Sequence, residues 1–201
     1  MKKFMLPMVA LVLFSFNTDT TKLTKEERQM VNKHLTETRD HMLNVLDDLT
    51  DEQLNFKPDA ATWSIAEVVE HLAIIENTFG GMVHKTVADG PNPALKDSLV
   101  FKDEQIMPMI TDRSNKVKTS EPFEPSGKFG SYEETLQAFL EKRSELIDYV
   151  KTTDDDLRNR YNKDLPFGAV DGVQLIVFTA AHTERHVLQM EEVMANANFP
   201  E

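Results

Sequence analysis

The sequence predicts an all-α protein, a four-helix bundle with a long connection between the second and third helices. Three observations support this fold class. Four segments of helical length open with a capping box, their apolar residues recur at helical spacing, and no alternating strand pattern of comparable length occurs. Helices of this kind bury their apolar faces against one another, and four of them form a bundle.

The first helix is expected over residues 24–49. Thr24 and Glu27 form a capping box, in which the threonine side chain accepts from a backbone N–H and the acid reaches back. A short turn should follow at Thr50, where Gln53 completes a second box. The apolar stripe of the first helix consists of Val31, Leu35, Met42, Val45, Leu46 and Leu49.

The second helix is expected over residues 64–88 and opens at the box of Ser64 and Glu67. The following stretch, residues 89–130, is rich in Pro, Gly and Asn and is too long for a hairpin loop. We therefore expect it to cross the bundle, with a short helix near residues 109–116.

The third helix is expected over residues 131–151, from the box of Ser131 and Glu134. Thr153 with Asp156 should begin a short turn after it. The stripe of the third helix consists of Tyr132, Leu136, Phe139, Leu146, Ile147 and Val150.

The fourth helix is expected over residues 171–196, from the box of Asp171 and Gln174. The N-terminus needs separate treatment, because two lysines precede an apolar run over residues 4–16, which is shorter than the roughly 20 residues of a membrane-spanning helix. We expect residues 1–20 to be a signal peptide or an N-terminal anchor. Residues 21–201 then form one domain, exported to the periplasm or another extracytoplasmic compartment, with a cytoplasmic location as the alternative.

The composition excludes several classes of protein. The formal net charge of -12 argues against a nucleic-acid partner, because phosphate binding relies on clustered Lys and Arg. Cysteine is absent, so a disulfide framework, a thiolate metal site and a cysteine nucleophile are excluded. Association with a membrane is expected only if the leader is uncleaved. The sequence is also compatible with a homodimer.

Three histidines form the candidate site. His182 and His186 stand four residues apart, so on a helix they project from one face and can bind a single ion. His71 shares a helical face with Val68 and Ile75, and therefore points into the core. A transition metal bound by three neutral imidazoles keeps a free coordination position, as in catalytic sites.

Each of these histidines has an alternative role as a hydrogen-bonded core residue. Three imidazoles inside an apolar bundle each need a polar partner, however, and one metal ion supplies it for all of them. The other three histidines are not part of the predicted site, since they lie on the flank or on another side of their helices. They are His34, His41 and His84.

Catalytic residues are not identified by the sequence, which offers two candidates. Glu67 precedes His71 by one turn and could carry a proton, although its place in the Ser64 box favours capping. Arg143 lies in an apolar stripe, where it could hold a substrate carboxylate or pair with a core acid. A metallopeptidase is disfavoured, because the His-Glu-x-x-His motif is absent and Glu184 faces away from its neighbouring histidines.

The residues around the three histidines resemble the DinB/YfiT-like superfamily. Its pattern Trp-Ser-x-x-Glu-x-x-x-His-Leu is met over residues 63–72, and its pattern His-x-x-x-His followed by Gln is met at His182, His186 and Gln189. The resemblance extends over about residues 23–197. Two further stretches are similar to the family, residues 112–113 and 139–143.

The resemblance implies a four-helix bundle with one divalent metal ion bound by His71, His182 and His186. Nickel or zinc is expected first, with iron or manganese as alternatives. Family members with a known reaction attach low-molecular-weight thiols such as bacillithiol to electrophiles, or isomerise maleylpyruvate with a thiol. We therefore expect a metal-dependent thiol S-transferase or hydrolase that acts on a small molecule. The alternative is a non-catalytic stress-response or binding module with a structural or vestigial metal site.

Overall fold

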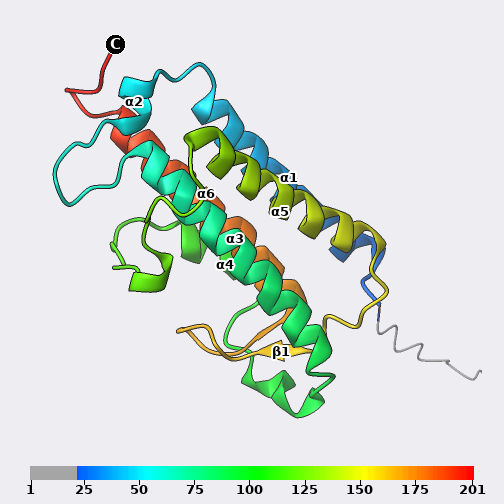
Figure 1. Cartoon of the computed structure of the whole chain (residues 1–201). Helices are drawn as coiled ribbons and strands as arrows, with labels where there is room; N and C mark the ends of the chain where they lie inside the picture. Colours follow the sequence, from blue (N-terminus) through cyan, green and yellow to red (C-terminus); the bar gives the residue numbers. More distant parts are fainter. Residues whose placement is uncertain (1–21) are drawn as a thin grey trace, which may run out of the picture.

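The computed structural model describes residues 22–201 and consists of four long helices that lie along one another (Figure 1). They form a closed ring, in which α1 packs on α5 and α6, and α3 packs on the same two helices. The predicted four-helix bundle is confirmed. The expected leader, residues 1–20, lies outside the described residues. The long helices are α1 (Lys25–Leu46), α3 (Ile65–Ala88), α5 (Tyr132–Thr152) and α6 (Gly172–Met194).

All four long helices begin at their predicted capping boxes, with both hydrogen bonds of each box formed. Their ends differ from the prediction. Helix α1 stops at Leu46, three residues early, and the chain then turns through Asp48, whose φ is 57°. The box at Thr50 opens the short helix α2 (Asp51–Asn55), as expected. The N-caps are Thr24, Ser64, Ser131 and Asp171.

The long connection crosses the bundle and contains three short helices. These are the 3₁₀-helix η1 (Pro93–Ser98), the α-helix α4 (Asp103–Thr111) and the 3₁₀-helix η2 (Glu121–Phe123). The short helix predicted near residues 109–116 is therefore misplaced. Helix α4 packs along α6 and buries Ile106, and this packing tolerates Pro108 inside the helix, where local propensity predicts a break.

The segment between α5 and α6 also differs from the prediction. The Thr153 hydroxyl accepts from the backbone N–H of Asp155 and donates to its carboxylate, so the expected pairing with Asp156 is wrong. A two-residue antiparallel ribbon follows, formed by β1 (Tyr161–Asn162) and β2 (Val170–Asp171). A strand of two residues is too short to show an alternating pattern, so this ribbon could not be predicted from the sequence.

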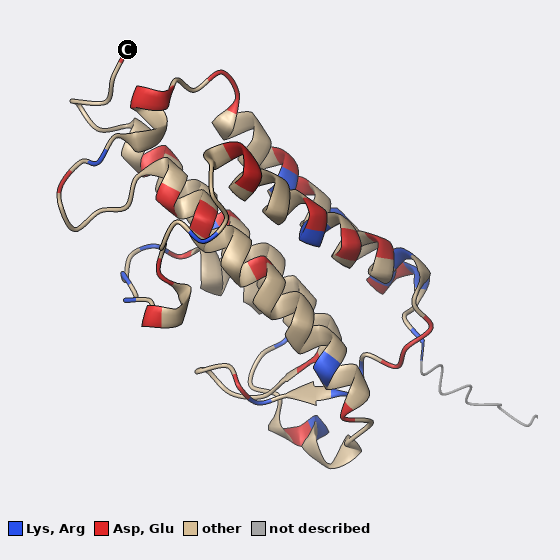
Figure 2. Ribbon diagram, in the orientation of Figure 1, with Lys and Arg blue, Asp and Glu red and all other residues tan. Residues whose placement is uncertain are grey.

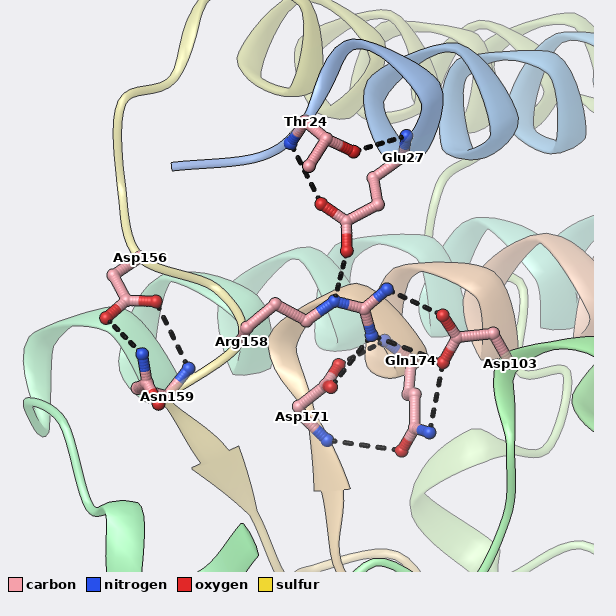
Figure 3. A network of polar contacts seen from close by, with 8 residues as sticks. All are labelled: Thr24, Glu27, Asp103, Asp156, Arg158, Asn159, Asp171 and Gln174. Atoms are coloured by element: carbon pink, nitrogen blue, oxygen red, sulfur yellow. Dashed lines mark hydrogen bonds and ion pairs between the residues drawn. The ribbon is translucent and has the colours of Figure 1, made fainter. Parts of the chain in front are cut away.

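One end of the bundle is held by Arg158, whose guanidinium contacts three carboxylates (Figure 3). Glu27 comes from the first turn of α1, Asp103 from the start of α4 and Asp171 from the N-cap of α6. Arg158 thereby fixes three helix N-termini relative to one another. No helix in residues 22–201 has the length and apolar character needed to cross a membrane.

Charge is concentrated on the outward faces of two helices. Figure 2 shows acidic and basic residues side by side along α1 and α5, whereas much of α3 carries neither. This difference agrees with burial, because α3 and α6 contribute more buried residues than α1 and α5. The candidate histidines are on α3 and α6, so they come from the two most enclosed helices of the bundle.

Candidate metal centre

The structure brings His71, His182 and His186 together. One ligand nitrogen from each ring lies within 4.8 Å of those of the other two. Two nitrogens that bind one ion at about 2.1 Å can be no more than about 4.2 Å apart, so the observed cluster is close to coordination geometry. The ring centroids are 4.5 Å apart for His71 and His186, 4.6 Å for His182 and His186, and 5.3 Å for His71 and His182.

Two packed helices produce this arrangement. Helix α3 starts at the Ser64 box and presents His71 two turns later, where the side chain is 2% exposed. Helix α6 lies against α3 and presents His182 and His186 on the facing side. Because both helices are capped and mostly buried, the positions of the three rings are set by the core.

In two of the rings, Nδ1 is hydrogen-bonded to a protein oxygen. Nδ1 of His71 lies 2.8 Å from the carbonyl oxygen of Phe123, and Nδ1 of His186 lies 2.9 Å from Oε1 of Gln189. These oxygens are acceptors, so each Nδ1 carries the proton and donates. In a neutral ring, Nε2 then keeps its lone pair for a metal, which is the usual arrangement of histidine ligands.

His182 differs from the other two histidines. Its Nδ1 is buried and has no hydrogen-bond partner among the described residues. The ring lies 5.7 Å from that of Phe79 and 6.0 Å from that of Phe178, neither of which supplies a polar atom. A buried nitrogen without a partner is uncommon and needs a physical explanation. The three clustered imidazoles fit a divalent ion, which would take one neutral nitrogen donor from each ring.

The environment keeps the three rings neutral. Burial lowers the pKa of His71, and it lowers the pKa of His182 to about 3. Burial also holds the pKa of His186 well below its usual range, and the neighbouring His182 and His71 lower it further. Neutral imidazole is the form that binds metal, so the rings do not have to lose protons at neutral pH.

Glu67 serves as a capping residue. One carboxylate oxygen accepts from the backbone N–H of Ser64 at 2.8 Å, and the other accepts from Lys57 at 2.9 Å. The capping interpretation is thus confirmed. Both oxygens have hydrogen-bond partners other than the imidazoles, and among residues 22–201 no hydrogen bond links Glu67 to His71.

Arg143 is enclosed in the core, away from solvent. Its side chain is 0% exposed, and it forms an ion pair with Glu76. All five N–H groups of the guanidinium have partners inside the protein. These contacts support the alternative of a pair with a core acid, and they leave no N–H group of the guanidinium free for a substrate carboxylate.

The remaining histidines lie outside the cluster, as expected. His41 contacts Glu184 at 3.0 Å and Glu191 at 3.4 Å, so Glu184 does face away from the two ligand candidates beside it. The ring of His84 lies 5.0 Å from that of Tyr149 on the other side of α3. These contacts separate a surface group of His and Glu from the enclosed three-histidine cluster.

Several groups that hold the site were not assigned this role from the sequence. The carbonyl of Phe123 has no sequence signal, because every residue carries one. Gln189 follows His186 by three residues and so shares its helical face, which was a usable signal. Arg185 donates to the carbonyl of Ile110, in the last turn of α4, and to that of Asn115 in the connection beyond α4.

Comparison with known proteins identifies the family of the chain. The model of the DinB superfamily matches residues 34–190. The uncharacterized protein YuaE of Bacillus subtilis (strain 168) is 31% identical over 150 residues, which cover 75% of this chain and 88% of YuaE. The solved structure of YfiT from Bacillus subtilis, described as a probable metal-dependent hydrolase with an unusual four-helix bundle topology, superimposes with a TM-score of 0.56 at 14% identity, over 89% of this chain and 91% of YfiT. The chain belongs to the DinB superfamily.

Proposed function

We propose that His71, His182 and His186 bind one divalent transition metal, and that the protein is a metal-dependent hydrolase acting on a small molecule. The observation behind this proposal is the convergence of three imidazole nitrogens within 4.8 Å of one another, from two helices far apart in sequence. In the described part of the chain, no carboxylate is hydrogen-bonded to any of these rings. The donors are therefore neutral, and a bound ion keeps its full positive charge.

The donor set favours a reactive ion over a structural one. Structural zinc sites usually have four protein ligands, whereas three leave a position for water or substrate. A divalent ion in such a site would act as a Lewis acid. It would activate a small nucleophile and polarise a group of the substrate. The likeness to YfiT, which is described as a probable metal-dependent hydrolase, supports hydrolysis.

The protein's own residues would orient this chemistry. The carbonyl of Phe123 and the amide of Gln189 fix the rings of His71 and His186 by holding their Nδ1 protons. Phe79 and Phe178 border His182 with apolar surface, which restricts water on that side. Apolar surroundings strengthen the interaction between a cation and the developing negative charge of a substrate.

Two other functions use the same site. Thiol transfer would need a thiol from a cosubstrate, because the chain contains no cysteine. A non-catalytic module with a structural metal is the second alternative, and one observation favours it. The two catalytic candidates named from the sequence, Glu67 as a proton carrier and Arg143 as a substrate-binding group, are both engaged by other residues of the protein.

The first test is the metal content of protein purified without a nickel column. We expect about one ion per chain, with nickel or zinc first and iron or manganese as alternatives, and loss of that ion in His182→Ala. His84→Ala is the matched control, since His84 is on α3 but outside the cluster. Metal-free wild type under conditions that load other zinc proteins would refute the metal site.

The second test is turnover by the metal-loaded protein. Ester and amide substrates report hydrolysis, and low-molecular-weight thiols with electrophiles report thiol transfer. The hydrolase proposal requires hydrolysis that disappears with a chelator and in His182→Ala. Thiol-dependent turnover alone would replace it by the transferase. Inert protein whose melting temperature still falls on chelation would support the non-catalytic module.

A further inference from the structure

Helix η2 and the loop that joins it to α5 are attached to α3 at two adjacent residues, Glu70 and His71. We call residues 121–130 the strap. Its Phe123 carbonyl oxygen accepts from Nδ1 of His71 at 2.8 Å. Three residues further along, the strap reaches the carboxylate of Glu70, the residue immediately before His71. The same turn of α3 thus contributes a candidate ligand and an anchor for the segment that orients it.

The attachment at Glu70 is unusually complete for a loop. Three consecutive backbone N–H groups donate to the one carboxylate, with N···O distances of 3.0 Å from Ser126, 3.0 Å from Gly127 and 2.8 Å from Lys128. Glu70 is only 9% exposed, so these bonds are formed largely away from water. Hydrogen bonds from N–H groups to an ionised acceptor are stronger than those to a neutral one.

The turn that presents these N–H groups depends on Gly127. Its φ is +73°, in the left-handed region that side chains other than glycine rarely adopt. The space around this residue is open, with no heavy atom within 4 Å of the position that a Cβ would occupy. A substitution at Gly127 would therefore strain the backbone of the strap without a steric clash and without altering α3.

The strap links Glu70 to the metal centre by a short covalent path. Glu70 and His71 are neighbours in a rigid helix, and Phe123 is three residues from Ser126. Fixing the N–H groups of residues 126–128 on Glu70 therefore limits how far the carbonyl of Phe123 can move from His71. If that carbonyl leaves, Nδ1 of His71 loses its acceptor, and the proton can occupy either ring nitrogen.

We propose that Glu70 is a positioning residue for the metal centre, which acts through the strap to hold the carbonyl of Phe123 on His71 and so directs Nε2 of His71 toward the ion. This inference rests on the proposed metal site. The hydrogen bonds that the Glu70 carboxylate accepts within the described chain all come from the strap, so its influence on the histidines is indirect.

The main experiment compares Glu70→Gln with Glu67→Gln. Both substitutions neutralise a carboxylate on the first turns of α3 that accepts a backbone N–H, but only Glu70 contacts the strap. We expect Glu70→Gln to raise the Kd for Zn²⁺, measured by competition with a chromophoric chelator, by about tenfold or more. In the metal-free variant, ¹⁵N NMR should show His71 as a mixture of tautomers, and trypsin should cut faster after Lys128. Glu67→Gln should show none of these changes.

A second pair of variants tests the strap from its own side. Gly127→Ala should weaken Zn²⁺ binding in the same direction but by a smaller factor, because strain loosens the turn. Gly90→Ala is the matched control, since Gly90 also has a positive φ, +86°, and open surroundings, but lies in the loop after α3. This pair decides the question if Glu70→Gln fails to fold.

The outcomes separate this inference from the proposed function. A released strap with unchanged Zn²⁺ affinity and an unchanged His71 tautomer would show that Glu70 only anchors the loop, and would overturn the inference. Failure of the wild type to bind Zn²⁺ would overturn the proposed function. In that case the tautomer of His71 in the four variants still shows whether the strap orients the ring.

Discussion

Arg143 and Glu76 form a bidentate ion pair at the centre of the bundle, with Nε 2.7 Å from Oε1 and Nη2 2.8 Å from Oε2. Their side chains are 0% and 1% exposed. The guanidinium also donates to the carbonyl of Leu35 and to the hydroxyls of Thr38 and Thr183. One side chain on α5 is thus bonded to α1, α3 and α6, and it joins all four long helices.

The first prediction concerns this pair. Arg143→Met should lower the free energy of unfolding by about 3–5 kcal/mol, because it leaves the Glu76 carboxylate buried without a counterion. Urea unfolding followed by helical circular dichroism measures the loss. The double variant Arg143→Met with Glu76→Leu should be more stable than the single one, since it removes the uncompensated charge. A double variant less stable than Arg143→Met would contradict this prediction.

The second prediction concerns Gln189. Gln189→Leu should weaken metal binding by about 10- to 100-fold, because Nδ1 of His186 loses its acceptor. Gln189→Glu should preserve binding, since a carboxylate accepts the same proton. Gln137→Leu, at an exposed position on α5, is the control. Chelator competition measures all three, and equal affinities for Gln189→Leu and wild type would exclude a role for this hydrogen bond.

The overall fold was predictable because its determinants are local. The boxes at Thr24, Ser64, Ser131 and Asp171 each satisfy two backbone N–H groups, and they marked all four helix starts. Helix ends were less certain, as in α1, where the chain leaves the helix at Leu46 although apolar residues continue to Leu49. Helix ends depend on the turn that follows, and the turn depends on tertiary packing.

The candidate site was predictable only for side chains with periodic spacing. His182 and His186 share a face by their separation of four, and His71 was oriented by its apolar neighbours. The role of Phe123 was hidden, because a backbone carbonyl leaves no mark on the sequence. Arg143 was ambiguous for another reason. Its apolar stripe required an anionic partner, but pairing with Glu76, 67 residues away, is a tertiary contact that helical periodicity cannot identify.

The third prediction concerns pH and the Arg158 cluster. Burial acts to raise the pKa of Asp103, but the hydrogen bond and charge of Arg158 outweigh it and lower the pKa overall. Stability from an acid with a lowered pKa is present above its unfolded value and is lost as the pH falls through the folded value. At pH 7, the free energy of unfolding of Asp103→Asn should therefore be about 1–2 kcal/mol lower than that of wild type. The difference should shrink below about pH 4.

Urea unfolding at a series of pH values checks this prediction, with Asp97→Asn, an exposed position on η1, as the control. Two other acids contact the same guanidinium. Asp171 has a raised pKa because of its burial, whereas the pKa of Glu27 is lowered despite burial, through Thr24 and Arg158. Both acids are present in wild type and in Asp103→Asn. The charge of Asp103 also raises the pKa of Asp171, so the measured difference contains the titration of Asp103 and this coupling to Asp171. A difference that grows toward acid would give the opposite sign and reject the argument.

The last prediction separates stability from metal binding at His182. Its buried Nδ1 has no partner among the described residues, and Phe79 and Phe178 lie beside the ring, so the metal-free fold carries an unsatisfied polar atom in apolar surroundings. Removing such an atom by an apolar side chain of similar size stabilises a protein, by about 1 kcal/mol or more. In a chelator, His182→Leu should therefore unfold at a higher urea concentration than wild type.

With Zn²⁺ present the order should reverse. Metal at about 100 times its Kd adds about 2.7 kcal/mol to the stability of a protein that binds it only when folded, and His182→Leu forgoes this contribution. The control is His84→Leu, because His84 lies outside the cluster. Its stability relative to wild type should be the same in the chelator and with Zn²⁺. A His182→Leu protein that is less stable than wild type in the chelator as well would mean that His182 is an ordinary core residue. The crossover between the two conditions is therefore the specific signature of a histidine retained for metal binding at the expense of the metal-free fold.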